Sequence, residues 1–345
     1  MNIAKQSRQP DELTLKLLER LRRDSRYLLT THRNADADGA GAEIGLNFLL
    51  RDMGKDVIIV NQEPLTDKLR FLDTDGIIKA EEDWNLNLLR DRTIVFLDNS
   101  EPERAGNLPE LIKPDRSNWI VIDHHDDTGA DYRVFFRDAR IGSTSEMIFE
   151  LLEAAGVTPP LEVAQAIYAG IVSDTGFFRY GKTRPRTHEI AARLLEMGVN
   201  SADISERLQK NSPLERLYLK QVLFNKLKVN KEKNVAWFEV RRRDVEDLNL
   251  SFGDLGDLVN ELIEPERIRA AVIFTERESN LTRASLRSKG AVNLLPAVAP
   301  YGGGGHKNAC GASFGLDLEN AVRELIPAVT ECVLSVHPQD IPPGD

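Results

Sequence analysis

Residues 27–38 read YLLTTHRNADAD, a short apolar run followed at once by one histidine and two aspartates. The run at 27–31 has the length of a buried strand. Similar runs at 57–60, 93–97 and 119–122 alternate with helix-like stretches at about 39–53 and 143–155. Gly54 and Gly156 follow these two helices, where a left-handed C-terminal cap is expected. The alternation predicts an α/β fold, with a parallel sheet covered by helices on both faces.

The rest of the chain is expected to form a connector and a second domain. Residues 202–227 are charged and contain few loop signals, which predicts one long helix. We therefore expect a first domain at 1–200, a helical connector at 201–230 and a smaller α/β domain with a mixed sheet at 231–337. Its predicted strands lie near 235–240, 270–275 and 282–287, with helices near 256–263 and from residue 319 onward. The polar, proline-rich tail 338–345 is expected to be disordered.

The composition indicates a protein that folds in the cytoplasm without disulfides. The chain has 345 residues, of which 41% are hydrophobic, enough for two cores. Cys310 and Cys332 are the only cysteines, so no disulfide framework is expected and a reducing compartment fits. The first 25 residues have the leucine spacing of an amphipathic helix rather than a signal peptide. No apolar run reaches the length of a membrane span, so no membrane partner is expected.

The net charge of −10 argues against long duplex DNA as a partner, because such binding depends on neutralising phosphates with basic residues. Part of this negative charge could instead lie in one acidic pocket that takes up divalent cations. A loaded pocket of that kind would attract phosphate.

Residues with ligand-type side chains follow three of the predicted strands. In an open parallel sheet, ligands bind beyond the carboxyl ends of the strands, so these side chains could converge on one place. Without cations, so many carboxylates in one place would repel one another. Carboxylates with some imidazole suit manganese or magnesium better than zinc. The residues are His32, Asn34, Asp36, Asp38, Asp98, Asp123, His124 and His125, with Asp174 supplied by the helix after residue 161.

Five motifs in this order resemble those of the DHH phosphoesterase superfamily. The resemblance covers roughly residues 25–335 and is closest to the nanoRNase and phosphoadenosine-phosphate phosphatase (NrnA-like) group. The C-terminal part resembles the DHH-associated domain, whose signature also fits residues 285–290. The motifs are Thr31-His32-Arg33-Asn34-Ala35-Asp36-Ala37-Asp38, Leu97-Asp98-Asn99-Ser100, Asp123-His124-His125, Ser173-Asp174-Thr175-Gly176 and Gly303-Gly304-Gly305-His306.

The resemblance implies a centre of two manganese ions, with magnesium or cobalt as alternatives. In such a centre, a bridging water is acidified and attacks phosphorus. His125 would face the phosphate, and Asp123 would orient the histidines. Asn34, Asn99 and Ser100 could serve similarly or act in turns. The resemblance assigns one ion to His32 and Asp36, the other to Asp38, His124 and Asp174, and both to Asp98.

The second domain is expected to hold the far end of the substrate. Four consecutive glycines at 302–305 let the backbone approach an anion closely. Arg179 and Arg283 are further candidates. Where the family has proline, threonine and alanine, this chain has Ala35, Asn99 and Cys310; these departures remove no ligand and bear on substrate preference. The implied substrate-binding residues are Arg287, Ser288, Gly303, Gly304, Gly305 and His306.

These features predict a manganese-dependent phosphodiesterase that cuts dinucleotides and very short oligonucleotides into mononucleotides. Phosphatase activity on 3′-phosphoadenosine 5′-phosphate is a second expected activity. Cleavage of cyclic di-AMP or its linear product pApA stays open, as does a RecJ-like exonuclease, although the latter would need a basic, aromatic-lined strand path. A homodimer is left open, and a binding protein without catalysis is disfavoured because every expected ligand is present.

Overall fold

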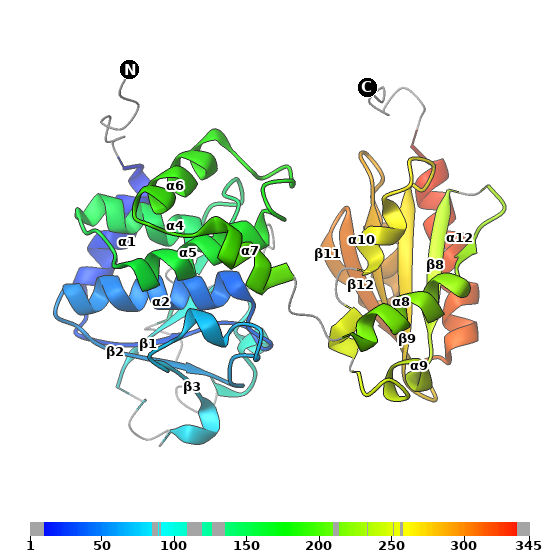
Figure 1. The fold of residues 1–345 in the computed structure, drawn as a ribbon, viewed down its shortest axis with the longest axis horizontal. Coiled ribbons are helices and arrows are strands. Elements are labelled where there is room, and N and C mark those ends of the chain that lie inside the picture. The colour runs from blue at the N-terminus through cyan, green and yellow to red at the C-terminus, as the bar shows by residue number, and fades with distance from the viewer. Residues whose placement is uncertain are drawn as a thin grey trace. The chain divides into compact units, whose positions relative to one another are not determined.

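The computed structural model describes residues 10–84, 89, 91–108, 119–125, 135–209, 214–232, 234–250, 252–255 and 258–336. The chain divides into two compact units, Met1–Asn211 and Ser212–Asp345. Figure 1 shows a sheet with helices in each unit. The predicted tail at 338–345 lies outside the described residues.

Unit 1 is built on a parallel sheet of six strands in the order β3-β2-β1-β4-β5-β6. Each neighbouring pair is parallel, and β1 lies between β2 and β4, with Leu28 opposite Ile58 on one side and Ile94 on the other. The carboxyl ends of β1, β4 and β5 therefore meet at one edge. The strands are β1 (Arg26–Thr30), β2 (Asp56–Asn61), β3 (Ile78–Ala80), β4 (Thr93–Leu97), β5 (Trp119–Asp123) and β6 (Phe135–Arg137).

The main helices of unit 1 pack together on one side of this sheet, above it in Figure 1. Helix α2 packs against α4 and α5 over much of its length. Gly41 and Gly45 make this approach close, because a Cβ on Gly41 would lie 2.4 Å from the carbonyl oxygen of Ala166. The helices are α1 (Glu12–Arg23), α2 (Ala37–Asp52), α4 (Thr144–Ala155), α5 (Leu161–Asp174), α6 (Pro185–Glu196) and α7 (Ser201–Gln209), with short 3₁₀ turns η2 (Arg70–Leu72), η3 (Glu81–Asp83) and η5 (Pro102–Ala105).

The strands of unit 1 are apolar on both faces, as expected for a parallel sheet that is covered on both sides. Val95 and Leu97 of β4 join the core beneath the helices, whereas Ile94 and Phe96 join a second cluster on the opposite face. That second cluster includes Trp119, whose ring centroid lies 5.1 Å from that of Phe96. Alternate side chains of β4 thus pack into the hydrophobic clusters on the two faces of the sheet, and this packing fixes the ends of the strands.

Unit 2 contains a mixed sheet of six strands in the order β11-β12-β10-β9-β8-β7. Strands β8 and β9 are parallel, and the other neighbours are antiparallel. The strands are β7 (Lys228–Val229), β8 (Val235–Val240), β9 (Ala270–Glu278), β10 (Leu281–Ser288), β11 (Gly304–His306) and β12 (Ala309–Phe314). The parallel sheet of unit 1 and the mixed sheet of unit 2 confirm the predicted α/β class, although the described α-helices of unit 1 lie on one face of its sheet where both faces were expected to carry them.

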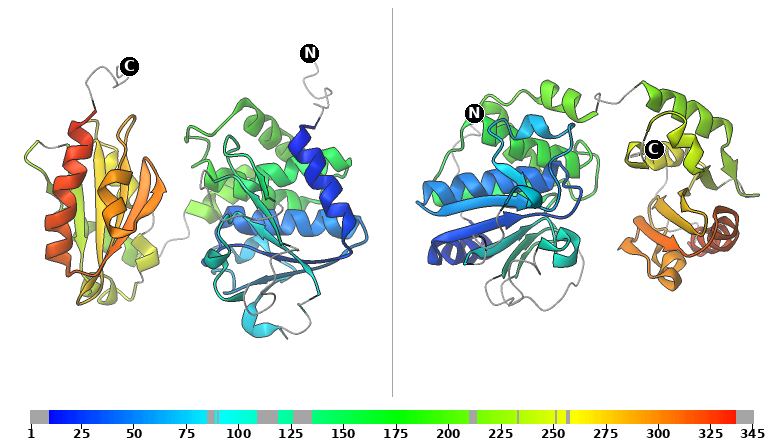
Figure 2. Two further views of the ribbon diagram at one scale, coloured as in Figure 1. Left: turned by 180° about the vertical axis from the view of Figure 1, so that it is seen from behind. Right: turned by 90° about the horizontal axis from the view of Figure 1, so that it is seen from below.

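Helices cover both faces of the second sheet (Figures 1 and 2). Val272 and Phe274 of β9 pack with α11 and α12, whereas Ala271 and Ile273 pack with α8 and α10. Successive side chains of a strand point to opposite faces, so a strand buried on both faces needs apolar residues at every position. The helices are α8 (Glu215–Asn225), α9 (Arg242–Glu246), α10 (Leu258–Ile263), α11 (Leu295–Val298) and α12 (Leu318–Leu334), with 3₁₀ turns η7 (Phe252–Leu255) and η8 (Ala299–Tyr301).

The expected single helix at 202–227 is found as two helices that belong to different units. α7 ends at Gln209 and α8 begins at Glu215, with residues 210–213 outside the described part. Leu219 and Leu223 of α8 lie in a core of unit 2, so this helix is part of that unit rather than a free connector. The caps after α2 and α4 are as predicted, since Gly54 and Gly156 have φ values of 75° and 70°.

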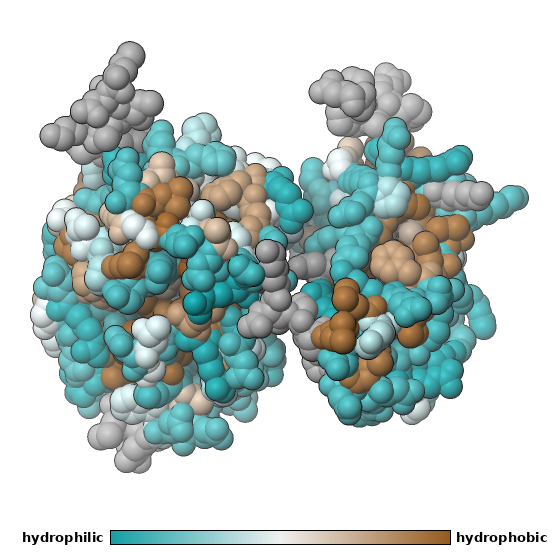
Figure 3. All heavy atoms as spheres, in the orientation of Figure 1, coloured by the Kyte–Doolittle hydropathy of each residue, from teal (hydrophilic) through white to brown (hydrophobic). Residues whose placement is uncertain are grey.

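On the face drawn in Figure 3, the surface of each unit is mostly hydrophilic, with hydrophobic side chains in small groups. In the described part of the chain, no helix is both long and apolar enough to cross a membrane.

Candidate metal centre

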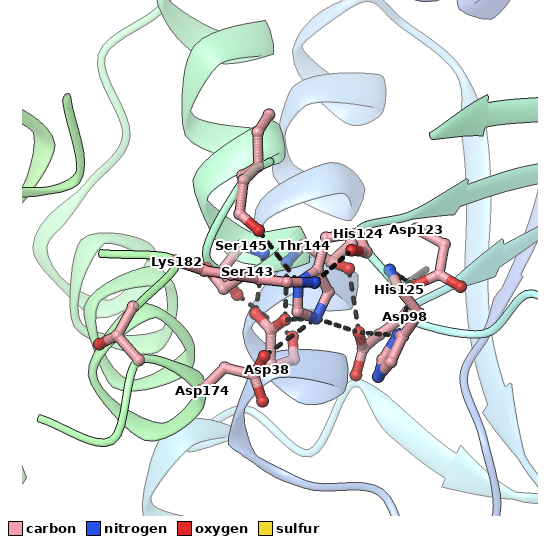
Figure 4. Close-up of polar contacts among 12 residues, drawn as sticks. Asp38, Asp98, Asp123, His124, His125, Ser143, Thr144, Ser145, Asp174 and Lys182 are labelled. Carbon is pink, nitrogen blue, oxygen red and sulfur yellow. Dashed lines mark hydrogen bonds and ion pairs between the residues drawn. The ribbon is translucent and has the colours of Figure 1, made fainter. Parts of the chain in front are cut away.

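The residues expected after the strands of unit 1 come together at the shared edge of its sheet. Figure 4 shows Asp38, Asp98 and Asp174 turned toward His124. Asp98 directly follows β4, and its own amide continues the sheet by donating to the carbonyl of Ile122 at 3.0 Å. Asp98 has a φ of 55°, a conformation that is uncommon for residues with a side chain and that re-aims the carboxylate at the end of its strand.

His32, Asp36 and Asp98 form one group whose ligand atoms could hold a cation. Nε2 of His32 lies 3.8 Å from Asp36 and 3.5 Å from Asp98. Nδ1 of His32 is 2.9 Å from the carbonyl of Arg33, which leaves Nε2 to face the carboxylates. Oδ1 of Asp36 accepts hydrogen bonds from Asp38 and Gly39 as the N-cap of α2, so Asp36 is a helix cap whose Oδ2 still points at His32.

Asp38, His124 and Asp174 form a second group of the same kind. Nε2 of His124 lies 3.9 Å from Asp38, 3.4 Å from Asp98 and 2.9 Å from Asp174. Nδ1 of His124 is 3.3 Å from the carbonyl of Ile141, so this imidazole also turns Nε2 inward. Asp98 lies between the groups, with Oδ2 toward His32 and Oδ1 toward His124.

Asp123 and His125 lie next to these groups. Nδ1 of His125 is 2.7 Å from Oδ1 of Asp123 and 3.6 Å from Asp98. The hydroxyl of Ser100 donates to the other oxygen of Asp123. Asp123 is fully buried, so it can orient the imidazole ring of His125 without contacting solvent. Asn34 has a φ of 54°, and its amide donates to Glu63 at 3.0 Å, which matches the turn role left open for it.

The N-terminus of α4 is a part of this centre that the sequence did not reveal. The backbone amides of Thr144 and Ser145 donate to the two oxygens of Asp38 at 2.6 and 2.8 Å. The hydroxyl of Thr144 also donates to Asp98 at 3.0 Å. Free amides at a helix start favour anions. The signal that could have shown this is Ser143, the N-cap of α4, followed by Glu146 in the S-x-x-E pattern of a helix start.

A second buried network supports the end of β1. Oδ1 of Asn61 accepts from the amide of Thr31 at 3.2 Å, and its amide group donates to Glu43 at 3.0 Å. Glu43 is fully buried in α2. Burial raises the pKa of Glu43 to about 8, although the hydrogen bond from Asn61 lowers it. This network holds the residue before His32, and periodicity alone gives no signal for it.

The protonation equilibria of the cluster reflect its excess of negative charge. Burial opposes protonation of His32, but Asp36 and Asp98 outweigh it and raise the pKa of His32 to about 11. Burial, and then the charges of Asp98 and Asp174, raise the pKa of Asp38 well above its usual value. The carboxylates therefore compete for protons that divalent cations would replace.

The donor set fits divalent cations. Nε2 of His124 is buried among carboxylates, 2.9 Å from an oxygen of Asp174 and 3.4 Å from one of Asp98, without a well-aligned hydrogen bond to either. A buried nitrogen left in this state among carboxylates is the expected geometry of a ligand. Oxygen donors with two imidazoles suit manganese or magnesium, since no thiolate lies in either group.

The second half of the glycine segment in unit 2 forms strand β11, Gly304–His306, rather than an open loop. It pairs with β12, with Gly304 opposite Gly311 and His306 opposite Ala309. A Cβ on Gly303 would lie 2.6 Å from the carbonyl oxygen of Gly311, whereas one on Gly304 would meet nothing within 4 Å. Packing thus explains the glycine at 303, but not the one at 304.

The other residues expected to bind substrate are found around β10. Arg287 lies opposite Ala309 of β12. The hydroxyl of Ser288 donates to the carbonyl of Val292 at 2.8 Å and accepts from Asn308 at 2.8 Å. Ser288 therefore already has a structural role. Arg283 pairs with Thr275 of β9 and Ser313 of β12 in the same sheet.

The parallel sheet and the carboxylate and imidazole cluster at its strand ends suit a hydrolase that acts on phosphate esters. Two family comparisons agree with this class. Residues 26–171 match the DHH family, N-terminal domain, and residues 232–335 match the DHHA1 domain. The chain belongs to the DHH family of phosphoesterases.

Several known proteins resemble this chain over most of its length. One is the bifunctional oligoribonuclease and PAP phosphatase NrnA of Thermus thermophilus, which is 32% identical over 88% of this chain and 89% of its own. An exopolyphosphatase-related protein from Bacteroides fragilis shares the fold with a TM-score of 0.83, at 24% identity over 93% of this chain and 97% of its own. A structure of exonuclease RecJ bound to manganese has a TM-score of 0.51, at 16% identity over 98% of this chain and all of its own.

Proposed function

We propose that this protein is an NrnA-type enzyme that hydrolyses very short oligonucleotides to mononucleotides and removes phosphate from 3′-phosphoadenosine 5′-phosphate. The observation that carries the proposal is the cluster of two carboxylate and histidine groups joined by Asp98, in a chain 32% identical to a relative named for both activities. The match to this relative covers 88% of the chain, so it extends into both units.

The six residues expected as ligands are proposed to hold two manganese ions. His32 and Asp36 serve one ion, Asp38, His124 and Asp174 the other, and Asp98 both. When bound, such a pair supplies an acidified water and neutralises charge on the transferred phosphoryl group. Manganese is favoured by the oxygen-rich donor set and by the ion named for the RecJ structure of the same fold.

The surrounding residues of this chain have distinct proposed roles. His125, positioned by Asp123 through the 2.7 Å contact, faces the substrate phosphate and donates a proton to it as a general acid. The amides of Thr144 and Ser145 fix the carboxylate of Asp38, so that its remaining lone pairs aim at a cation. In unit 2, Arg287, Ser288, Gly303, Gly304, Gly305 and His306 are proposed to bind the substrate away from the scissile bond.

The test is a single assay with manganese that compares several substrates. These are a 5′-phosphorylated dinucleotide, a long single strand, cyclic di-AMP, pApA, 3′-phosphoadenosine 5′-phosphate and pyrophosphate. We expect fastest turnover of the dinucleotide, with 3′-phosphoadenosine 5′-phosphate also hydrolysed. Fastest turnover of the long strand would instead identify a RecJ-like exonuclease, and preference for cyclic di-AMP or pApA would identify a signalling-nucleotide phosphodiesterase.

A further inference from the structure

The segment that follows Asp174 has an unusual backbone. Gly176, Phe177 and Phe178 have φ values of 57°, 60° and 65°. Bulky side chains rarely adopt this left-handed conformation, so three residues in a row need strong support from their surroundings. Phe178 supplies part of it, with its ring centroid 5.0 Å from that of His188. The run curls the chain back toward the end of α5.

This curl fixes the backbone of Tyr180 next to the end of α5, whose last residue is Asp174. The amides of Arg179 and Tyr180 both donate to the carbonyl of Thr175 at 3.0 Å. Thr175 is fully buried, and its hydroxyl donates to the carbonyl of Ile171 at 2.7 Å. Tyr180 is therefore tied by its backbone to the residue that follows Asp174, a proposed ligand.

The ring of Tyr180 is supported on one side and open on the other. A Cβ added to Gly176 would lie 2.4 to 2.6 Å from three carbons of this ring, so only glycine allows the ring to lie against the backbone there. The tyrosine is nevertheless 50% exposed. One ring face thus rests on Gly176 while much of the side chain faces solvent.

The segment that carries Tyr180 also carries two cationic side chains. Nζ of Lys182 donates to the carbonyl of His124 at 3.3 Å, and Figure 4 shows its side chain extended toward that histidine. Nε of Arg179, which is exposed, donates to the carbonyl of Gly176 at 2.7 Å. An exposed, supported aromatic ring in the same segment as two cations matches the way in which single-stranded nucleic acids are held, with bases stacked and phosphates neutralised.

We propose that Tyr180 is a stacking platform for a nucleobase of the substrate whose phosphate is bound at the metal centre. This inference rests on the proposed function and names the part of the substrate that unit 1 itself recognises. Stacking on an aromatic ring accepts any base, because every base has a π face. The platform therefore selects nucleotides over other phosphate esters without selecting a sequence.

The first test separates binding from turnover. Substituting Tyr180→Ala should raise KM for a 5′-phosphorylated dinucleotide about 10-fold to 100-fold, the usual effect of losing one stacked base, with kcat changed far less. Tyr180→Phe should keep the wild-type KM, since the ring remains. Tyr218→Ala is a matched control, because Tyr218 is also 50% exposed but lies in α8 of unit 2. An unchanged KM in Tyr180→Ala would overturn the proposal.

The second test does not depend on turnover of dinucleotides. Calorimetry with manganese present compares AMP with ribose 5-phosphate, which carries the same phosphate but no base. Wild type should bind AMP more tightly, and Tyr180→Ala should lose that difference while binding ribose 5-phosphate as before. If wild type failed to hydrolyse dinucleotides, the proposed function would be wrong, and this comparison would still decide on Tyr180. Equal binding of both ligands by wild type would reject the platform.

Discussion

The backbone amide of Thr144 donates a 2.6 Å hydrogen bond to the carboxylate of Asp38, which lies 106 residues earlier in the chain. This bond joins the start of α4 to the first turn of α2 at the centre of the candidate site. The cluster is therefore assembled by packing of whole helices as well as by the strand ends. Its stability and its metal affinity should respond together to changes at these helix starts.

Asp98→Asn should abolish most of the activity, because the proposed bridging carboxylate reaches toward both histidines. We expect manganese affinity and turnover to fall by more than about 100-fold, above the range typical of residues that only orient a ligand. Asp123→Asn, which changes such an orienting residue, should have the smaller effect. Calorimetry with manganese and a dinucleotide assay measure both. Wild-type metal binding in Asp98→Asn would contradict the proposed bridge.

Ser143→Ala should weaken both the fold and the metal centre. The hydroxyl of Ser143 accepts from the amide of Glu146 at 3.0 Å, and losing an N-cap costs about 1 kcal/mol of unfolding free energy. Asp11→Ala removes an equivalent cap from α1, where Asp11 accepts from Thr14 at 2.7 Å. Urea unfolding should show similar losses in both variants. Only Ser143→Ala should also lower manganese affinity. If both variants bound manganese as tightly as wild type, the N-cap of α4 would have no role in the metal site.

Glu43→Gln should change how stability depends on pH. The pKa of Glu43 is about 8 in the folded protein, above its unfolded value of 4.5, so its stabilising contribution is complete below pH 4.5 and is lost as the pH rises to about 8. Across this window wild type should lose up to about 1.4 kcal/mol per pH unit relative to the variant. Gln keeps an oxygen to accept from Asn61. Urea unfolding of both proteins at several pH values measures the difference, and parallel curves would refute it.

Gly304→Ala should lower substrate affinity without unfolding unit 2. A Cβ at this position meets nothing within 4 Å, so the unfolding free energy should change by less than about 0.5 kcal/mol. The added methyl group would keep the substrate from approaching the backbone amides here. We expect KM for a dinucleotide to rise about 10-fold, which corresponds to the loss of one hydrogen bond between substrate and protein. Gly303→Ala is the contrasting control, because its Cβ would collide with the carbonyl of Gly311 and destabilise the fold. A wild-type KM in Gly304→Ala would show that Gly304 does not take part in substrate binding.

Much of the fold could be predicted because buried strands leave a direct signal. The bounds predicted for β4 and β8 agree with those observed, Thr93–Leu97 and Val235–Val240. Strands β11 and β12 gave no such signal, since GGH and ACGASF contain small residues where alternating large ones are usual. The division into α7 and α8 was also missed, although the sequence between them contains Asn211, Ser212 and Pro213, residue types that often end one helix and start the next.

The candidate site was predictable only as a set of side chains. The structure brings His32, Asp36, Asp38, Asp98, His124 and Asp174 into adjoining groups, and their role as ligands stays a prediction. The donors to Asp38 are peptide amides, which every residue carries; the S-x-x-E pattern at Ser143 marks the start of α4 but does not show which carboxylate its amides bind. Tyr180 was overlooked for a related reason, since its position depends on the left-handed curl at 176–178.

Both α2 and α4 begin at the acidic cluster, with Asp36 capping one and the amides of the other holding Asp38. The positive ends of two peptide dipoles thus offset part of the carboxylate charge before any ion arrives. We therefore expect unit 1 to fold before it binds any ion. A divalent cation would then bind at side chains that are already held in place, and removing the cation should leave the fold of unit 1 intact.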